Sequence, residues 1–237
     1  MTDFTQNKTK TTPSLSDRRS TTRHMKPNHN IPVPFEIVDN VRQYNFRRCC
    51  NYIIALGKQK FGDQFRLYNS DREILYKLMV YAIGDEEECK RQGLDLNKGI
   101  LLNGPIGCGK TSLMTLIRTL HDPPTRYVMK STRDIASEFN QDGFMVIHKY
   151  GKHHKVFCFD DLGAENNTKY YGTECNTISE ILLYRYDLLL HYGIITHATT
   201  NLNADELEEL YGNRVRSRLR SMFNLIAFNQ NTSDKRN

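Results

Sequence analysis

A glycine-rich segment near the middle of the chain has the residue types of a phosphate-binding loop. Gly104, Gly109, Lys110 and Thr111 follow the spacing G-x-x-x-x-G-K-[ST]. The glycines let backbone N–H groups approach phosphate oxygens, the lysine can reach the β- and γ-phosphates, and the threonine hydroxyl can bind Mg²⁺. We therefore expect a bound nucleotide and Mg²⁺, with the nucleotide contacting these residues: Gly104, Pro105, Ile106, Gly107, Cys108, Gly109, Lys110, Thr111 and Ser112.

The competing interpretation of this segment is a glycine-rich turn that only connects two elements. The flanking sequence favours phosphate binding, because residues 98–102 form a short apolar run typical of a buried strand and residues 111–120 are typical of a helix. A phosphate loop requires a strand before it and a helix after it, since the helix N-terminus contributes N–H donors and a positive dipole end.

Two aspartates, Asp160 and Asp161, end a mostly apolar segment at residues 155–161 that predicts a buried strand. Carboxylates in this position lie at the carboxyl edge of a parallel sheet, where ligands bind. We assign Asp160 to the Mg²⁺ shell and Asp161 to the orientation and deprotonation of an attacking water molecule, with Glu165 as a third nearby carboxylate. The alternative, an acidic turn facing solvent, is disfavoured by the preceding phosphate loop.

The segment "ATTNL" at residues 198–202 ends the next predicted strand. If that strand is adjacent to the acidic one, Asn201 or Thr200 lies between the γ-phosphate and the two aspartates. An amide is suited to positioning a water molecule, so Asn201 is the preferred candidate. The alternative is a turn that caps the following helix, a role for which Asn203 is suited.

Four arginines, at positions 214, 216, 218 and 220, lie in one predicted helix. They can form a solvated basic face, contact DNA, or place one guanidinium against the γ-phosphate of a neighbouring subunit, and their spacing does not choose among these. A further arginine, Arg185, lies on the apolar face of the helix at 176–193. A charge there is costly unless it is paired, so we expect a structural ion pair. The alternatives are a side chain that reaches solvent and one that reaches across a subunit interface.

Composition restricts the class of protein. The chain has 237 residues, a formal net charge of +6 and six cysteines without C-x-x-C spacing. These features favour a mildly basic cytoplasmic protein with reduced thiols and no zinc site. We find neither a signal peptide nor an apolar run long enough to cross a membrane.

The chain divides into four predicted parts. Residues 1–34 are predicted to be a disordered basic tail. The apolar segment at 31–38 contains two prolines and is expected to be extended, and it can either dock on a partner or pack on its own domain. The region at 35–92 is predicted to be a helical extension, with its helices within residues 41–92. Residues 93–229 alternate strand and helix as in a parallel α/β domain, with strands at 98–102, 126–131, 155–161, 194–202 and 223–229, and residues 230–237 are expected to be frayed.

The order of motifs resembles one known family. "GPIGCGKT", "FDDLGAE", "TTNL" and "YGNRVRSRL" together resemble the DnaC/IstB group of helicase-loader and transposition-helper ATPases, within the AAA+ superfamily. The resemblance covers residues 98–228. It implies an α/β P-loop NTPase fold of the AAA+/ASCE class, a three-layer sandwich with a five-stranded parallel sheet in the order 5-1-4-3-2. It also implies the absence of a C-terminal lid and the presence of a small helical N-terminal extension.

The resemblance further implies roles for individual residues. Asn201 matches the first sensor, Arg218 the arginine finger and Arg214 a further nucleotide-contacting basic position, so the implied catalytic set is Lys110, Asp161, Asn201 and Arg218. The implied cofactors are ATP and Mg²⁺. The implied partners are single-stranded DNA, a replicative helicase or a transposase, and further copies of the chain assembled through ATP interfaces. Asp161 departs from the glutamate that many AAA+ proteins have, which predicts slow hydrolysis.

Three functions compete on the sequence alone: an ATP-driven helicase loader or transposase helper, a small-molecule kinase, and an ATP-binding switch without turnover. Two aspartates at one strand end and an asparagine at another are suited to holding a water molecule as the acceptor of the phosphoryl group. This combination disfavours the kinase. DNA-binding candidates are the basic run at 149–155, Lys130 and Arg133, the arginines at 214–220 and the N-terminal tail, with Tyr127 and Tyr150 as residues that could stack on bases.

Overall fold

The computed structural model describes residues 3–6, 31–165, 168–170 and 173–236. These residues form two compact units, Met1–Asp85 and Glu86–Asn237, which are described separately below. Much of the segment that the sequence predicts to be a disordered tail, residues 7–30, lies outside the described residues.

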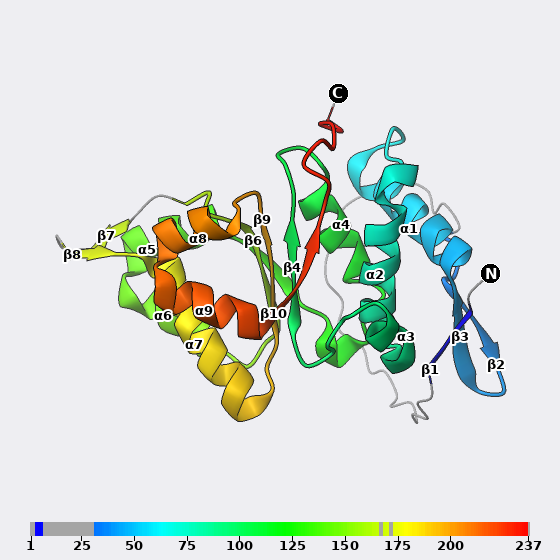
Figure 1. The fold of residues 1–237 in the computed structure, drawn as a ribbon, viewed down its shortest axis with the longest axis horizontal. Helices are drawn as coiled ribbons and strands as arrows, with labels where there is room; N and C mark the ends of the chain where they lie inside the picture. Colours follow the sequence, from blue (N-terminus) through cyan, green and yellow to red (C-terminus); the bar gives the residue numbers. More distant parts are fainter. Residues whose placement is uncertain (1–2, 7–30, 166–167, 171–172, 237) are drawn as a thin grey trace, which may run out of the picture. The chain divides into compact units, whose positions relative to one another are not determined.

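The first unit begins with a small antiparallel sheet rather than a helix (Figure 1). Strands β1 (Asp3–Gln6), β2 (Phe35–Val38) and β3 (Val41–Asn45) pair in the order β1-β3-β2. Asp39 and Asn40 join β2 to β3 with φ angles of 51° and 63°, the backbone of a two-residue hairpin turn. Residues 35–38 are extended, as predicted. Residues 41–45, which the sequence predicts to be helical, form the second strand of this hairpin instead, because Asp39 and Asn40 tolerate the left-handed backbone of the turn.

The helical part of the first unit follows this hairpin. Helix α1 (Phe46–Phe61) starts where the Asn45 side chain accepts hydrogen bonds from two backbone N–H groups, and α2 (Arg72–Ile83) follows the short 3₁₀ turn η1 (Asn69–Asp71). The apolar stripe predicted on α2 is buried, and it consists of Ile74, Leu75, Leu78 and Met79.

The second unit has the alternation predicted for a parallel α/β domain. Its elements are, in chain order, α3 (Glu86–Arg91), β4 (Gly99–Asn103), α4 (Lys110–Ile117), η2 (Pro123–Thr125), β5 (Val128–Ser131), α5 (Thr132–Asp142), α6 (Phe144–Gly151), β6 (Phe157–Leu162), β7 (Thr168–Tyr170), β8 (Thr173–Cys175), α7 (Thr177–Tyr192), β9 (Thr196–Thr200), α8 (Ala204–Tyr211), α9 (Asn213–Met222) and β10 (Phe223–Ala227). Strands β7 and β8 form a separate hairpin.

The central sheet has the order β10-β4-β9-β6-β5, and all of its strand pairs are parallel. Numbered along the domain, this is the order 5-1-4-3-2, which confirms the prediction. Helix α4 lies on one face of the sheet and α5 to α9 lie on the other, so the unit is a three-layer sandwich (Figure 1). Strand β9 lies between β4, which leads into the phosphate loop, and β6, which ends in the two aspartates.

The core on the α5–α9 face is continuous. Phe157, Phe159 and Leu162 of β6 pack there with the apolar faces of these helices. All six cysteines are free thiols. Within the described residues, no helix combines the length and the apolar character needed to cross a bilayer.

Arg185 of α7 is fully buried, but it does not form the ion pair that the sequence predicts. Its guanidinium donates hydrogen bonds to the Thr196 hydroxyl (2.7 Å) and to the backbone carbonyls of His153 (2.6 Å) and Ile195 (3.0 Å). It also lies 5.5 Å from the centre of the Phe157 ring. Desolvation lowers the pKa of Arg185 to about 10, so it remains charged at neutral pH. Carbonyl dipoles therefore take the place of a carboxylate.

We expect Arg185→Ala to lower the free energy of unfolding by about 3 kcal/mol, because it leaves buried carbonyls and a hydroxyl without their donor. Chemical denaturation measures this change. Arg133→Ala, on the exposed side of α5, is the matched control and should change it by less than about 0.5 kcal/mol. Equal effects of the two variants would contradict a bonding role for Arg185.

Candidate nucleotide site

The phosphate loop joins β4 to α4 and contains nine of the ten residues predicted to contact nucleotide, the tenth being Arg214 of α9. Gly107 and Gly109 have φ angles of 79° and 100°, which glycine adopts without strain. Lys110 is 7% exposed, and its Nζ donates to the carbonyls of Gly104 (2.8 Å) and Pro105 (3.0 Å). The loop is thereby folded around the lysine.

Two side chains of the loop are not suited to phosphate binding. Ile106 is 64% exposed, whereas Cys108 is fully buried. Both residues can therefore contribute only backbone groups to phosphate binding. Thr111 and Ser112, at the start of α4, have accessible side chains.

The two aspartates occupy a bulge in β6. Phe159 pairs with Ala198 and Leu162 with Thr200, so Asp160 and Asp161 together face Thr199 of β9. A bulge of this kind redirects side chains at a strand end. Asp161 has a φ of 66°, a left-handed conformation that side-chain-bearing residues rarely adopt.

Thr199 holds this bulge with its hydroxyl group. The Thr199 Oγ1 donates to Asp160 Oδ1 (2.7 Å) and accepts from the Asp161 backbone N–H (2.8 Å). The Thr132 hydroxyl donates to the Asp161 carbonyl (2.8 Å). Neither Thr199 nor Thr132 is among the site residues predicted from the sequence. Thr199 directly precedes Thr200, which was considered as a candidate. The feature that could have identified Thr199 is a hydroxyl group near the end of the strand next to the one that carries the two aspartates.

Burial raises the pKa of Asp160 above its ordinary value, and the neighbouring Asp161 adds to the rise. Hydrogen bonds from Thr199 and Thr111, and the charge of Lys110, oppose it. A carboxyl group with a raised pKa binds a proton more strongly in the folded than in the unfolded chain, so its ionisation lowers stability as pH rises through that range. A cation bound beside Asp160 would favour the ionised form of this carboxyl group.

Thr111 and Asp160, the two residues predicted to bind Mg²⁺, are hydrogen-bonded to each other. The Thr111 Oγ1 donates to both carboxylate oxygens of Asp160, at 3.0 and 2.9 Å, which brings two oxygen ligands together. Mg²⁺ prefers oxygen ligands and takes one or two of them from protein, completing its shell with phosphate and water. The described residues contain no group of three or more His, Cys, Asp or Glu side chains that could hold a metal. The donor set of Thr111 and Asp160 thus fits Mg²⁺.

Asn201 directly follows β9, and its side chain is exposed. Because β9 lies between β4 and β6, the topology brings Asn201 to the sheet edge that carries the loop and the aspartates. Thr200, the other candidate, is buried and donates to the Leu162 carbonyl (2.8 Å), which is a structural role. Asn203 caps α8 as proposed, in a capping box with Glu206.

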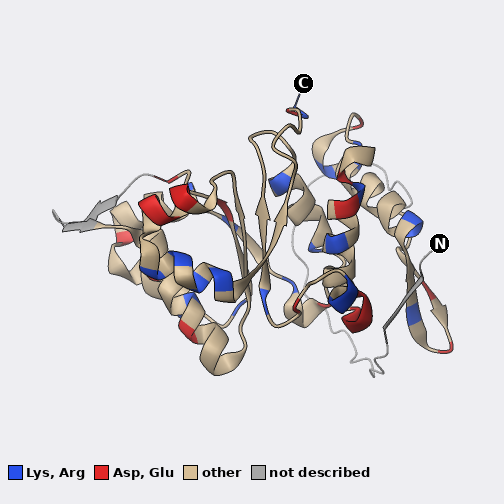
Figure 2. Ribbon diagram, viewed as in Figure 1, with Lys and Arg blue, Asp and Glu red and all other residues tan. Residues whose placement is uncertain are grey.

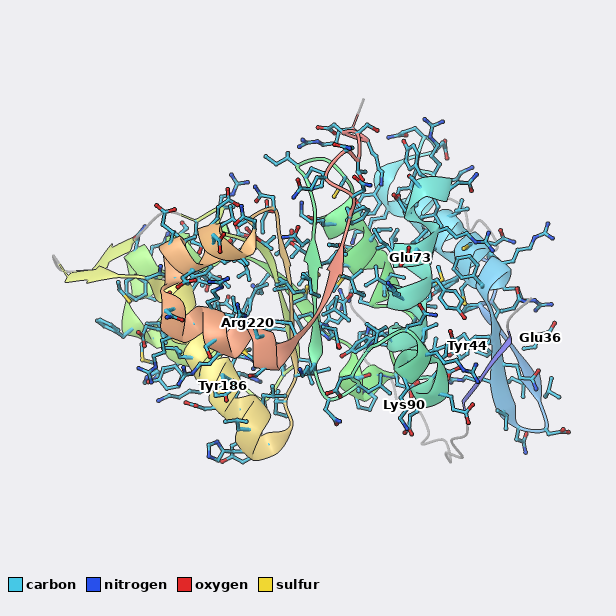
Figure 3. The ribbon with its side chains drawn as sticks, in the orientation of Figure 1. Glu36, Tyr44, Glu73, Lys90, Tyr186 and Arg220 are labelled. Carbon is cyan, nitrogen blue, oxygen red and sulfur yellow. The ribbon has the colours of Figure 1, made fainter. Side chains whose placement is uncertain are left out.

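The arginines of α9 have different environments. Arg216 forms ion pairs with Glu208 and Asp205 of α8, whereas Arg214 and Arg220 are exposed. The Arg218 guanidinium donates to the Arg214 carbonyl (3.0 Å) and lies 5.1 Å from the centre of the Tyr186 ring on α7. Figure 2 shows this basic helix beside the acidic α8, and Figure 3 labels Tyr186 and Arg220.

In the part of the chain that the structure describes, neither Arg214 nor Arg218 makes a hydrogen bond or ion pair with the phosphate loop or with the two aspartates. Glu165 is also engaged elsewhere. It accepts hydrogen bonds from the Tyr211 hydroxyl and the Gly163 backbone N–H. Within a single chain, the site therefore consists of the loop, the two aspartates and their threonines, with Asn201 at the same sheet edge.

The aromatic residues suggested for stacking on DNA bases cannot do so in this structure. Tyr127 and Tyr150 are 0% and 1% exposed. The Tyr150 hydroxyl donates to Glu138, which also forms an ion pair with Lys149 (2.7 Å). Both rings are buried in the core, which the composition of the surrounding sequence does not indicate.

Comparison with known proteins gives structural matches only. No family model matches the chain, and no curated protein matches it. Among solved structures, a candidate primosome component from Streptococcus pyogenes serotype M3 has a TM-score of 0.51 and 18% identity, over 72% of this chain and 86% of that one. The DnaC helicase loader has a TM-score of 0.48 and 22% identity, over 70% and 95% of the two chains.

DnaI has a TM-score of 0.49 and 21% identity, over 71% of this chain and 87% of its own. The candidate primosome component has the highest TM-score of these three structures, and its likeness shows that the two chains share a fold. At 18% identity this likeness establishes the fold alone.

We expect Thr199→Val to move the acid limb of Mg²⁺-dependent nucleotide binding to higher pH. The hydroxyl of Thr199 favours the ionised form of Asp160, so its loss raises the pKa of that carboxyl group further. Binding measured by calorimetry between pH 5 and pH 8, about the range in which proteins are most stable, reports the shift.

The matched control is Thr200→Val, which removes the neighbouring hydroxyl on the same strand. It should lower the free energy of unfolding by about 1 kcal/mol without moving the acid limb. An unchanged acid limb in Thr199→Val would show that this hydroxyl does not act on Asp160.

Proposed function

We propose that this chain is a DnaC-like AAA+ ATPase that acts on DNA in the cytoplasm and hydrolyses ATP to ADP and phosphate. The observation that carries the proposal is the contact between Thr111 and Asp160. It joins the phosphate loop to the acidic strand end, next to the buried Lys110. A glycine-rich turn without nucleotide has no need of this combination of ammonium, hydroxyl and carboxylate.

The proposed chemistry follows from these groups. The ammonium of Lys110 and the N–H groups at the start of α4 hold the β- and γ-phosphates, and Asp161 orients the attacking water and accepts its proton. Asn201 positions the same water from the adjacent strand end. Mg²⁺, when bound through Thr111 and Asp160, neutralises charge on the β- and γ-phosphates.

The arginines of α9 supply the part of the site that one chain lacks. Arg218, with Arg214 beside it, is proposed to reach the γ-phosphate bound by a neighbouring copy of the chain. The support for this role is the resemblance of "SRL" to the arginine-finger motif, together with the exposed position of Arg214 and the partly exposed position of Arg218. The proposal therefore includes a homo-oligomer with ATP at its interfaces.

The proposed client is a replicative helicase, loaded onto single-stranded DNA during replication. The support is the resemblance in motif order to the helicase-loader group and the similarity in fold to a candidate primosome component. The same motifs occur in transposition helpers, so help to a DNA transposase is the second candidate. Hydrolysis of ATP would distinguish a helicase loader or a transposase helper from an ATP-binding switch without turnover.

We expect the ATP hydrolysis rate per chain to rise with protein concentration and to rise further with single-stranded DNA, because the proposed site is completed by a second copy. Arg218→Ala should lower the rate at high concentration by about 1,000-fold, the lower end of the range for a missing arginine finger, while leaving ATP affinity unchanged. Steady-state phosphate release measures the rate, and calorimetry measures the affinity.

Arg220→Ala is the matched control, since it removes an exposed arginine from the same helix. It should keep the dependence on protein concentration. A rate that is flat with concentration and with DNA would contradict the shared site, and transfer of phosphate to a small metabolite would favour a kinase. Tight ATP binding without turnover would favour the switch.

A further inference from the structure

The segment that follows β10 lies along the phosphate loop. We call residues 228–236 the strap. The sequence predicts a frayed end at 230–237, whereas the described residues of the strap contact the loop at two points. The strap bends through a turn in which the Thr232 backbone N–H donates to the Asn229 carbonyl (2.9 Å).

Phe228 fixes the first point. Its backbone N–H donates to the Asn103 carbonyl (2.8 Å), which extends the pairing of β10 with β4 up to the loop. The Phe228 ring is 4% exposed and packs beside Gly104, where an added Cβ would come within 2.7 Å of the Phe228 Cβ. Because Gly104 has no side chain, Phe228 of the strap can pack directly against the phosphate loop.

Lys235 fixes the second point. Its backbone N–H donates to the Gly107 carbonyl (3.0 Å), and its Nζ donates to the Cys108 carbonyl (2.8 Å). The same Nζ lies 4.9 Å from the centre of the Phe228 ring. Asp234 packs on Gly107, where a Cβ would fall 2.2 Å from its carboxyl carbon, and its charge is paired with Arg236 (2.7 Å).

These contacts involve the carbonyl side of the loop. In a trans peptide the C=O and N–H groups point in opposite directions. A donor that holds the Cys108 carbonyl therefore turns the Gly109 N–H the other way, away from the strap. Phosphate loops bind phosphate through such N–H groups. The Lys235 ammonium thus contacts the carbonyl side of the Cys108–Gly109 peptide and not its N–H side.

We propose that Lys235 is a positioning residue of the nucleotide site, which fixes the peptide between Cys108 and Gly109 so that its N–H group is aimed at the bound phosphates. The inference rests on the proposed ATP binding and adds to it a contribution from the strap. Lys235 acts through the loop, and its side chain does not replace Lys110. Without its ammonium group, the loop samples other peptide orientations, and binding of nucleotide must then restrict them.

The test compares Mg²⁺·ADP and Mg²⁺·ATP affinities, by calorimetry, in the full chain and in Lys235→Ala. We expect about 10-fold weaker binding in the variant, the size of one hydrogen bond from a charged donor. Lys235→Arg, which keeps a charged donor, should recover most of the affinity. The thermal midpoint without nucleotide should stay within about 2 °C in all three proteins.

Two further variants make the result decisive. Lys90→Ala removes an exposed lysine of α3, labelled in Figure 3, and should bind nucleotide like the parent chain. Lys110→Ala should abolish binding. If Lys110→Ala binds normally, the proposed ATP site itself fails. If Lys110→Ala fails to bind but Lys235→Ala binds as well as or better than the parent, the positioning role is overturned, and tighter binding would mean that the strap competes with nucleotide.

Discussion

The carboxylate of Asp160, held by two hydroxyl groups, is the interaction on which the rest of the site depends. Thr111 reaches it from α4 and Thr199 reaches it from β9, so the loop helix and two strands of the sheet are joined at one charge. Burial opposes that charge and the hydroxyls favour it. A buried, ionised Asp160 lowers the stability of the chain when no cation is bound, and a bound cation stabilises it. Residues with perturbed pKa values are common at functional sites.

Much of the second unit follows from the sequence, because its signals are local. The glycine spacing, the apolar runs and the polar strand ends predict the loop, the parallel strands and the placement of Asp160 and Asn201 at one sheet edge. The resemblance in motif order supplies the strand order that the apolar runs alone leave open. The capping role of Asn203 is also local, since it depends only on the next three residues.

The remainder depends on contacts between distant residues. The bulge at Asp160 and Asp161 is defined by how β6 pairs with β9. The sequence of β6 by itself therefore predicts neither the bulge nor the role of Thr199. The hydrogen-bond partners of Arg185 are backbone carbonyls from other parts of the chain. A buried guanidinium can be stabilised by such carbonyls as well as by a carboxylate, and the sequence does not show which of them is present. The strap contains few apolar residues, and its course depends on carbonyl groups of the loop that a polar sequence does not reveal.

The central claim is that the loop and the acidic strand end form one Mg²⁺·nucleotide site. The most direct measurement is a crystal structure of the chain with Mg²⁺ and a non-hydrolysable ATP analogue. The account predicts the β-phosphate enclosed by the N–H groups of residues 107–111, the Lys110 ammonium on the phosphates in place of the Gly104 carbonyl, and the metal bound to Thr111. An analogue bound elsewhere, with the Lys110–Gly104 and Thr111–Asp160 hydrogen bonds unchanged, would contradict it.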